Sequence, residues 1–180
     1  MIIGIIRNFH EFLDKHNINH WVDSGTLLGA VRDKGLIPYD VDADFGMDEP
    51  GYIFLRDNEV EVPEPYILNV WNSTMNDPGN RDEPLAVRFI HKKSGLYADM
   101  FVFKDDVDEE GKPVMGPPRS GCFGGCVRCP QDEDGGLFQV PDNWVFPVHM
   151  CKFEDFTVPC PHDSARYLDH LFGDDFMTHK

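Results

Sequence analysis

Residues 21–47 read WVDSGTLLGAVRDKGLIPYDVDADFGM, a glycine-bearing turn followed by three aspartates on alternate residues, Asp40, Asp42 and Asp44. Like charges at this spacing repel one another, so a cation is the natural compensation. Side chains two residues apart in a β-strand share one face, which would aim Asp42 and Asp44 at one place while the apolar residues beside them enter the core. Two converging carboxylates can hold the divalent cations that serve phosphoryl transfer.

Two other interpretations of the aspartates are weaker. An EF-hand calcium loop that started at Asp40 would need glycine where Phe45 stands and glutamate where Gly51 stands. A solvent-facing edge strand is a poor place for three aspartates, because aspartate is depleted in strands. The pattern therefore favours a metal site.

A further carboxylate, Asp99, lies in the apolar run LYADMFVF at 96–103. Burying a lone carboxylate in such a strand costs free energy unless the group is paired. We predict that Asp99 joins Asp42 and Asp44 in a site for Mg²⁺ or Mn²⁺. The alternative is an ion pair with Arg88 on the neighbouring strand, and both arrangements can hold at once.

Ser24, Gly25 and Thr26 join a predicted strand over 19–23 to a predicted helix over 26–34, for which Gly35 is the expected C-terminal cap. The N-terminus of a helix offers backbone N–H groups and a positive dipole end to an anion. We therefore expect this turn to contact a phosphate group.

Acidic residues dominate the composition, because 32 Asp and Glu stand against 16 Lys and Arg and give a formal net charge of −16. Such a surface repels phosphate backbones, which disfavours nucleic acid as a partner. The sequence contains no apolar run long enough for a membrane span. At 180 residues the chain suits a single domain, 1–180, with its own hydrophobic core.

Hydrophobic periodicity predicts an α+β arrangement. Apolar residues at spacings of three and four predict a helix over 2–13 that stops near Asn17. A strand is expected over 39–47, a hairpin over 85–103 and a final helix over 162–172. Residues 48–84 are rich in proline and asparagine, so short strands alternating with loops are expected there.

Five cysteines, at 122, 126, 129, 151 and 160, leave the choice between metal and crosslinks open. Cys126 and Cys129 have the spacing of a zinc knuckle, and with Cys122 and Cys151 they would supply four ligands to a structural Zn²⁺. Disulfides in an oxidising compartment would order the same glycine-rich segment, and free thiols are the third alternative.

The runs SGTLLGAVR at 24–32 and IPYDVDADFG at 37–46 resemble the double motif of the LicD/fukutin-related family, a branch of the nucleotidyltransferase superfamily related in fold to DNA polymerase β. The run VFPVHMCKFEDFTVPCPHDSARYLDHLFGDDFM at 145–177 is also similar to the family, although Phe172 and Phe176 stand where tyrosine and tryptophan are usual. Asp99 falls where the superfamily places its third carboxylate. The resemblance implies an α+β (α/β) nucleotidyltransferase fold, with a mixed sheet flanked by helices and a cysteine-rich insertion at about 111–136.

For function, the resemblance implies Mg²⁺-dependent transfer of a phospho-substituent, such as phosphocholine or ribitol phosphate, from a CDP-linked donor to a glycan hydroxyl, with release of CMP. Asp42 and Asp44 would hold the metal, and Asp99 would complete the site and accept the hydroxyl proton. The predicted substrate contacts are Ser24, Gly25, Thr26, Arg32, Asp40 and Arg88.

Two alternatives remain for the same fold. It could transfer a nucleotidyl group from an NTP, or it could be a non-catalytic module that binds a nucleotide or a glycan. Members of the family work in bacterial cells and in the eukaryotic secretory pathway, so cytoplasmic and Golgi-lumenal locations both stay open.

Overall fold

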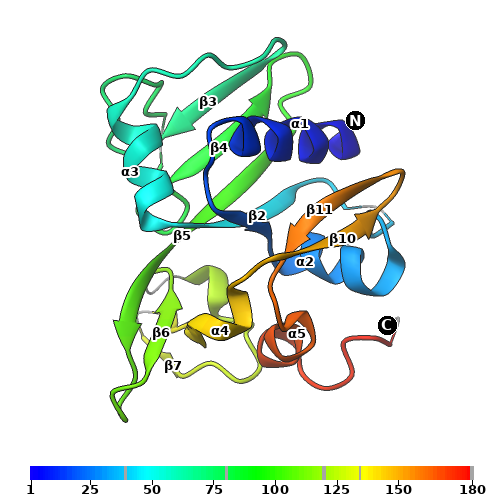
Figure 1. Cartoon of the computed structure of the whole chain (residues 1–180), viewed down its shortest axis with the longest axis vertical. Helices are drawn as coiled ribbons and strands as arrows, with labels where there is room; N and C mark the ends of the chain where they lie inside the picture. The colour runs from blue at the N-terminus through cyan, green and yellow to red at the C-terminus, as the bar shows by residue number, and fades with distance from the viewer. Residues whose placement is uncertain (39, 80, 119–120, 134, 179–180) are drawn as a thin grey trace.

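The computed structural model of the protein describes residues 1–38, 40–79, 81–118, 121–133 and 135–178 (Figure 1). The first half of the chain forms α1 (Ile2–Lys15), β1 (His20–Val22), α2 (Ser24–Leu28), a π-helical turn (Gly29–Asp33), β2 (Ala43–Asp48), α3 (Glu49–Asp57), β3 (Tyr66–Val70) and β4 (Val87–His91). The second half forms β5 (Tyr97–Val107), β6 (Pro113–Gly116), a 3₁₀ turn (Gly121–Phe123), β7 (Gln131–Asp132), β8 (Gly135–Gly136), β9 (Val140–Pro141), α4 (Asp142–Val145), β10 (His149–Phe153), β11 (Phe156–Cys160) and α5 (Ser164–Phe172). The predicted α+β class is confirmed.

The main sheet is mixed and has the strand order β1-β2-β5-β4-β3, extended by β6 beside β5 and by β9 beside β6. β2 and β5 run parallel, whereas the other neighbouring strands run antiparallel. A parallel pair needs a crossover connection, which here contains α3, β3 and β4. This crossover places two distant parts of the chain side by side at the centre of the sheet.

Helix α1 covers β4 and β5 and supplies much of the aromatic core (Figure 1). The ring of Phe9 is fully buried, with its centroid 5.1 Å from that of Phe45 in β2 and 4.8 Å from that of Phe89 in β4. The predicted amphipathic helix is therefore present. It ends at Lys15, and Asn17 follows with a φ of 54°.

The predicted hairpin and final helix are also present, as the antiparallel pair β4–β5 and as α5. Asp163 caps α5, because its carboxylate accepts a hydrogen bond from the N–H of Arg166. The same device begins α3, where the carboxylate of Asp48 accepts from the N–H of Gly51 at 3.0 Å. The expectation of only strands and loops over 48–84 was wrong at α3, although β3 lies where a strand was expected.

The segment between α2 and β2 also differs from the prediction. The helix expected over 26–34 is the short α2 followed by the π-helical turn, and Lys34, not Gly35, takes the left-handed conformation with a φ of 61°. Strand β2 begins only at Ala43, so Val41 is 67% exposed and does not enter the core. Tyr39, the first residue of the predicted strand, lies outside the described residues.

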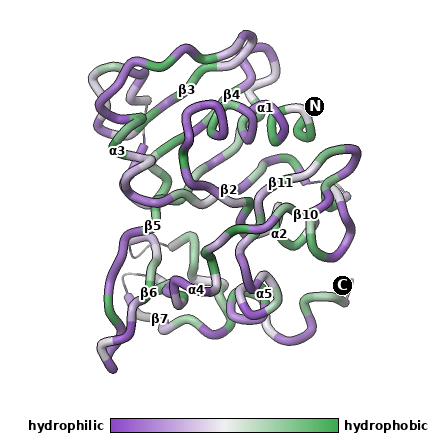
Figure 2. Tube along the Cα trace, in the orientation of Figure 1, coloured by the Kyte–Doolittle hydropathy of each residue, from purple (hydrophilic) through white to green (hydrophobic). Residues whose placement is uncertain are grey.

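None of the helices in the described ranges is long and apolar enough to cross a membrane. Figure 2 shows hydrophilic residues gathered in the turn between β5 and β6, where Glu109 and Glu110 are exposed.

Candidate active site

The parallel pairing of β2 with β5 places Asp44 directly opposite Asp99. The antiparallel pairing of β4 with β5 places Arg88 opposite Asp99 on the other side. Three charged residues thus lie in one row across the sheet, although they come from three different strands. Asp42 precedes β2 by one residue.

Asp42, Asp44 and Asp99 line one cavity of about 450 Å³ together with Ser24 and Gly25. The remaining lining residues are Leu85, Phe101, Cys122, Phe123, Gly125, Cys126, Leu171 and Phe172. The lining of this cavity, called the acidic pocket below, therefore combines three carboxylates with apolar residues and cysteines, most of which come from residues 122–126, the end of α5 and β5.

Asp44 is fixed by its backbone. Its N–H donates to the hydroxyl Oγ1 of Thr26 at 2.9 Å, and its C=O accepts from the N–H of Asp23 at 2.9 Å. Burial raises the pKa of the Asp44 carboxyl well above its ordinary value, and the carboxylates of Asp23, Asp42, Asp99 and Asp40 raise it further, in that order. The ionised form of Asp44 is thus disfavoured until positive charge is supplied.

Asp23 is a member of this cluster that the sequence analysis missed. It is fully buried, accepts from the N–H of Ser24 at 2.6 Å and from the hydroxyl of Tyr167 in α5 at 2.8 Å. Burial raises the pKa of Asp23 to about 6, against the opposing effect of the hydrogen bonds from Tyr167 and Ser24. Its position before a small-residue turn is typical of an N-cap, which could have identified it.

Asp99 is held by two guanidinium groups. Arg88 Nε and Nη2 lie 2.5 and 2.7 Å from its two carboxylate oxygens, and Arg81 Nη1 lies 3.3 Å from Oδ1. The guanidinium of Arg88 also stacks on Tyr97, 3.7 Å from the ring centroid. The alternative ion pair with Arg88 is therefore present at the same time as the placement of Asp99 in the acidic pocket. Arg81 was not anticipated.

Asp40 lies next to Asp42 just before β2. Burial raises the pKa of the Asp40 carboxyl, and a hydrogen bond with Asp42 raises it further. A Cβ on Gly25 would lie 3.4 Å from the Asp40 carboxylate oxygen Oδ2, so Asp40 reaches the start of α2.

Of the predicted substrate contacts near α2, two line the acidic pocket and two do not. Ser24 and Gly25 line the acidic pocket, and Ser24 has a φ of 45°, an uncommon conformation for a residue with a side chain. Thr26 is buried, so it positions Asp44 instead of facing the pocket. Arg32 is paired with Asp33 and lines a neighbouring hollow, which shares Phe172 with the acidic pocket.

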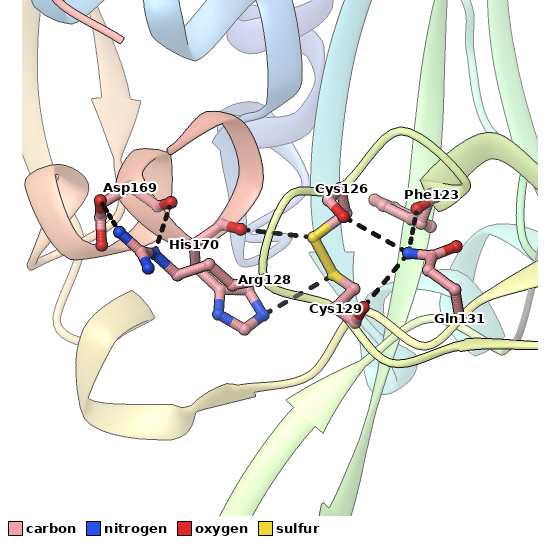
Figure 3. Close-up of a disulfide and its surroundings, with 7 residues drawn as sticks. All are labelled: Phe123, Cys126, Arg128, Cys129, Gln131, Asp169 and His170. Atoms are coloured by element: carbon pink, nitrogen blue, oxygen red, sulfur yellow. Dashed lines mark hydrogen bonds and ion pairs between the residues drawn. A yellow bond between two sulfur atoms is a disulfide. The ribbon is translucent and has the colours of Figure 1, made fainter. Parts of the chain in front are cut away.

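The four cysteines predicted as a possible zinc set are not brought together. Cys126 and Cys129 form one disulfide, and Cys151 forms another with Cys160 between β10 and β11. Because β10 and β11 form a separate hairpin, Cys151 is not a neighbour of the other three. Figure 3 shows instead that His170 of α5 approaches the first disulfide.

The donor set of the acidic pocket suits a hard divalent cation. Carboxylate oxygens are the ligands that Mg²⁺ and Mn²⁺ prefer. The pKa of Asp44 is raised by burial first and by the neighbouring carboxylates second, and a bound cation would favour the ionised form against both. Within the described residues, however, the ligand oxygens of Asp42, Asp44 and Asp99 do not all lie within 4.8 Å of one another. Asp42 and Asp44 would hold the ion, beside an Asp99 that is already paired with arginines. The roles of these three residues stay predictions.

Comparison with known proteins places the chain in a family. Residues 17–163 match the family model described as LicD/FKTN/FKRP, nucleotidyltransferase domain. The lipopolysaccharide cholinephosphotransferase LicD of Haemophilus influenzae is 38% identical over 50 residues, which are 28% of this chain and 19% of that protein. The ribitol 5-phosphate transferase FKRP of Homo sapiens is 23% identical over 164 residues, which are 89% of this chain and 29% of that protein.

A solved structure, the lincosamide antibiotic adenylyltransferase LnuA bound to lincomycin, aligns with 97% of this chain and 92% of its own, at 13% identity and a TM-score of 0.45. The chain spans between 11% and 29% of the length of the curated relatives it matches. On the family model, which covers most of its residues, the chain belongs to the LicD/FKTN/FKRP family of nucleotidyltransferase domains.

Proposed function

We propose that the chain transfers a phospho-substituent, such as phosphocholine, ribitol phosphate or a similar group, from a CDP-linked donor to a glycan hydroxyl and releases CMP. The relatives named as a cholinephosphotransferase and a ribitol 5-phosphate transferase support this class of reaction. The observation that carries the proposal is the opposition of Asp44 and Asp99 on adjacent parallel strands, with Asp42 in the same cavity.

Asp42 and Asp44 would hold Mg²⁺ or Mn²⁺. A divalent cation bound there neutralises charge on the diphosphate and on the departing CMP. Asp23 and Thr26 hold the backbone of Asp44, so the ligand geometry is set before the substrate arrives. Arg88 and Arg81 bring two positive charges to Asp99, which suits a site that must accept an anionic donor.

In the proposed reaction the glycan hydroxyl oxygen forms a bond to the phosphorus that carries the alcohol. The bond from that phosphorus to the oxygen of CMP breaks, and CMP leaves with the electron pair. The hydroxyl proton passes to a carboxylate of the pocket, with Asp99 as the predicted acceptor. Phe101, Phe123 and Phe172 supply an apolar wall that reduces access of water to the phosphorus.

The test is to incubate the protein with Mg²⁺, glycan acceptors and a panel of CDP-alcohols, and to measure release of CMP. Asp42→Asn should abolish release, whereas Asp155→Asn, a matched change in an exposed ion pair with Arg7, should leave it unchanged. Retention of most activity in Asp42→Asn would contradict the proposal. Release of pyrophosphate from an NTP would indicate nucleotidyl transfer, and absence of metal-dependent nucleotide binding would indicate a binding module.

A further inference from the structure

The loop of residues 126–129 is fastened to the C-terminal end of α5. The N–H of Val127 donates to the C=O of Leu171 at 3.0 Å, and the N–H of Arg128 donates to the C=O of His170 at 3.1 Å. The last C=O groups of a helix have no partners within the helix, so the loop supplies them. These bonds do not depend on the disulfide.

Side chains add to this attachment (Figure 3). The guanidinium of Arg128 donates to the C=O and to the carboxylate of Asp169, at 3.2 and 2.8 Å. Gln131 Nε2 lies 3.2, 3.4 and 3.3 Å from the carbonyl oxygens of Phe123, Cys126 and Cys129. Breaking the bond between the two sulfurs would therefore leave both of them beside α5.

His170 faces the two sulfurs from α5. Its Nε2 lies 3.7 Å from Cys129 Sγ, and the ligand atoms of Cys126, Cys129 and His170 all lie within 4.8 Å of one another. In a tetrahedral zinc site, with Zn–S of about 2.3 Å and Zn–N of about 2.0 Å, sulfur and nitrogen ligands stand about 3.5 Å apart. The separation of His170 from Cys129 is close to this value.

The chemistry of the three side chains agrees with their placement. Burial lowers the pKa of His170, and Arg128 lowers it further, so the imidazole is neutral at physiological pH and can bind a metal. Thiolate and imidazole ligands suit Zn²⁺, in contrast to the carboxylates of the acidic pocket, which suit Mg²⁺.

We propose that Cys126, Cys129 and His170 form a site for Zn²⁺ or a similar cation once their disulfide is reduced. A thiol reductant supplies two electrons and two protons and converts the disulfide into two thiols. Metal binding then releases the thiol protons. The disulfide and the metal exclude one another, because sulfurs joined to each other cannot act as two separate thiolate ligands.

This site adjoins the acidic pocket, since its Cys126 also lines that pocket. The proposal does not depend on the function proposed above. It keeps Cys126 and Cys129 of the zinc set expected from sequence and replaces Cys122 and Cys151 with His170, because the described ligand atoms that lie together are those of Cys126, Cys129 and His170.

Cobalt(II) is a suitable probe, because thiolate ligands give it sulfur-to-metal charge-transfer bands that carboxylate ligands do not. The second cysteine pair has its own histidine, with His149 Nε2 3.5 Å from Cys151 Sγ, so the measurement is made in the full chain carrying Cys151→Ser and Cys160→Ser. After reduction, this parent should bind one cobalt per chain with such bands, and Zn²⁺ should displace it.

His170→Gln and Cys129→Ser should each weaken cobalt binding at least about tenfold. Mutation of a residue that only supports a metal ligand can cost this much, so removal of a ligand should cost at least as much. Arg166→Gln, at an exposed position one turn earlier on α5, is the matched control and should bind normally. Circular dichroism checks that each variant is folded, and the oxidised parent is a negative control that needs no further mutation. Absence of the bands in the reduced parent, equal binding by the oxidised parent, or unchanged binding in His170→Gln would overturn the proposal.

Discussion

The two walls of the acidic pocket are built in opposite ways. Asp44 and Asp99 stand opposite each other in a parallel strand pair at the centre of the sheet. Phe123 and Cys126 come from a segment whose neighbouring strands, β7 and β8, are two residues long and pair only with each other. The charged wall thus depends on correct strand pairing within the main sheet. The wall that contains Phe123 and Cys126 depends on hydrogen bonds to α5 and on a disulfide that a reductant can break.

The largest effect is expected from Asp44→Asn on the charged wall. Activity should fall at least about 10²-fold. Loss of a residue that orients a metal ligand already costs about 10- to 100-fold, and loss of the ligand itself should cost no less. Since the pKa of Asp44 is raised in the folded state, its ionised form opposes folding at neutral pH. Without divalent metal the variant should therefore be more stable than the wild type.

Turnover assays and thermal unfolding in a chelator measure the two effects of this change. An active variant that is also less stable would show that Asp44 serves only the fold. Glu61→Gln, at an exposed position, is the control for a change of one acidic group.

The next largest effect is expected from Arg88→Met, which leaves the carboxylate of Asp99 without its two-bond partner. Breaking a largely buried pair by removing one member costs about 3 kcal/mol in the free energy of unfolding. Denaturant titration measures this loss. The double variant Arg88→Met/Asp99→Asn should recover part of it, because it removes the charge of Asp99, which Arg81 alone compensates less well. No recovery would mean that packing of Arg88 on Tyr97 matters more than the ion pair.

A smaller, pH-dependent effect is expected at Asp23, whose pKa is raised to about 6 from 3.8. A carboxyl with a raised pKa contributes stability that is fully present below about pH 4 and is lost as pH rises through about 6. Relative to Asp23→Asn, which does not titrate, the wild type should lose roughly 2–3 kcal/mol over that window. Free energies of unfolding at several pH values test this, and parallel curves for the two proteins would contradict it.

The smallest effect is expected from loss of the disulfide between Cys126 and Cys129, on the cysteine side of the pocket. In the loop-entropy account, the disulfide between Cys126 and Cys129, three residues apart, contributes about 2 kcal/mol, and the one between Cys151 and Cys160, nine residues apart, contributes about 3 kcal/mol. Replacing each pair by serine and measuring oxidised proteins by denaturant titration compares them. A larger loss from the first pair would show that the pocket wall depends on its crosslink more than on its bonds to α5.

Much of the fold could be predicted because its elements carry local patterns. Helix α1 follows from apolar spacing, and the β4–β5 hairpin follows from two apolar runs around a turn. Helix α3 was missed although Asp48 and Pro50 are residues typical of a helix start, because the surrounding composition suggested loops. The late start of β2 could not be predicted from alternation alone.

The candidate site could be predicted only in part, for a physical reason. The meeting of Asp44 with Asp99 could be expected from strand patterns. Asp42 also lines the pocket, but it lies just before β2, so the shared strand face that predicted its position is not what places it there. The buried Asp23 accepts a hydrogen bond from Tyr167, which lies 144 residues away in sequence, and Arg81 reaches Asp99 from a loop. No local pattern encodes such contacts, and the same is true of the meeting of His170 with Cys129.

The crossover between β2 and β5 has a consequence for how the protein matures. A chain synthesised only as far as β4 contains Asp42 and Asp44 but lacks the strand that bears Asp99. Contacts between such distant segments form late, because the intervening chain must be ordered first. If the proposed transfer occurs, the earliest turnover by a refolding sample would coincide with insertion of β5 between its two neighbours, and an enzyme assay would serve as a clock for that event.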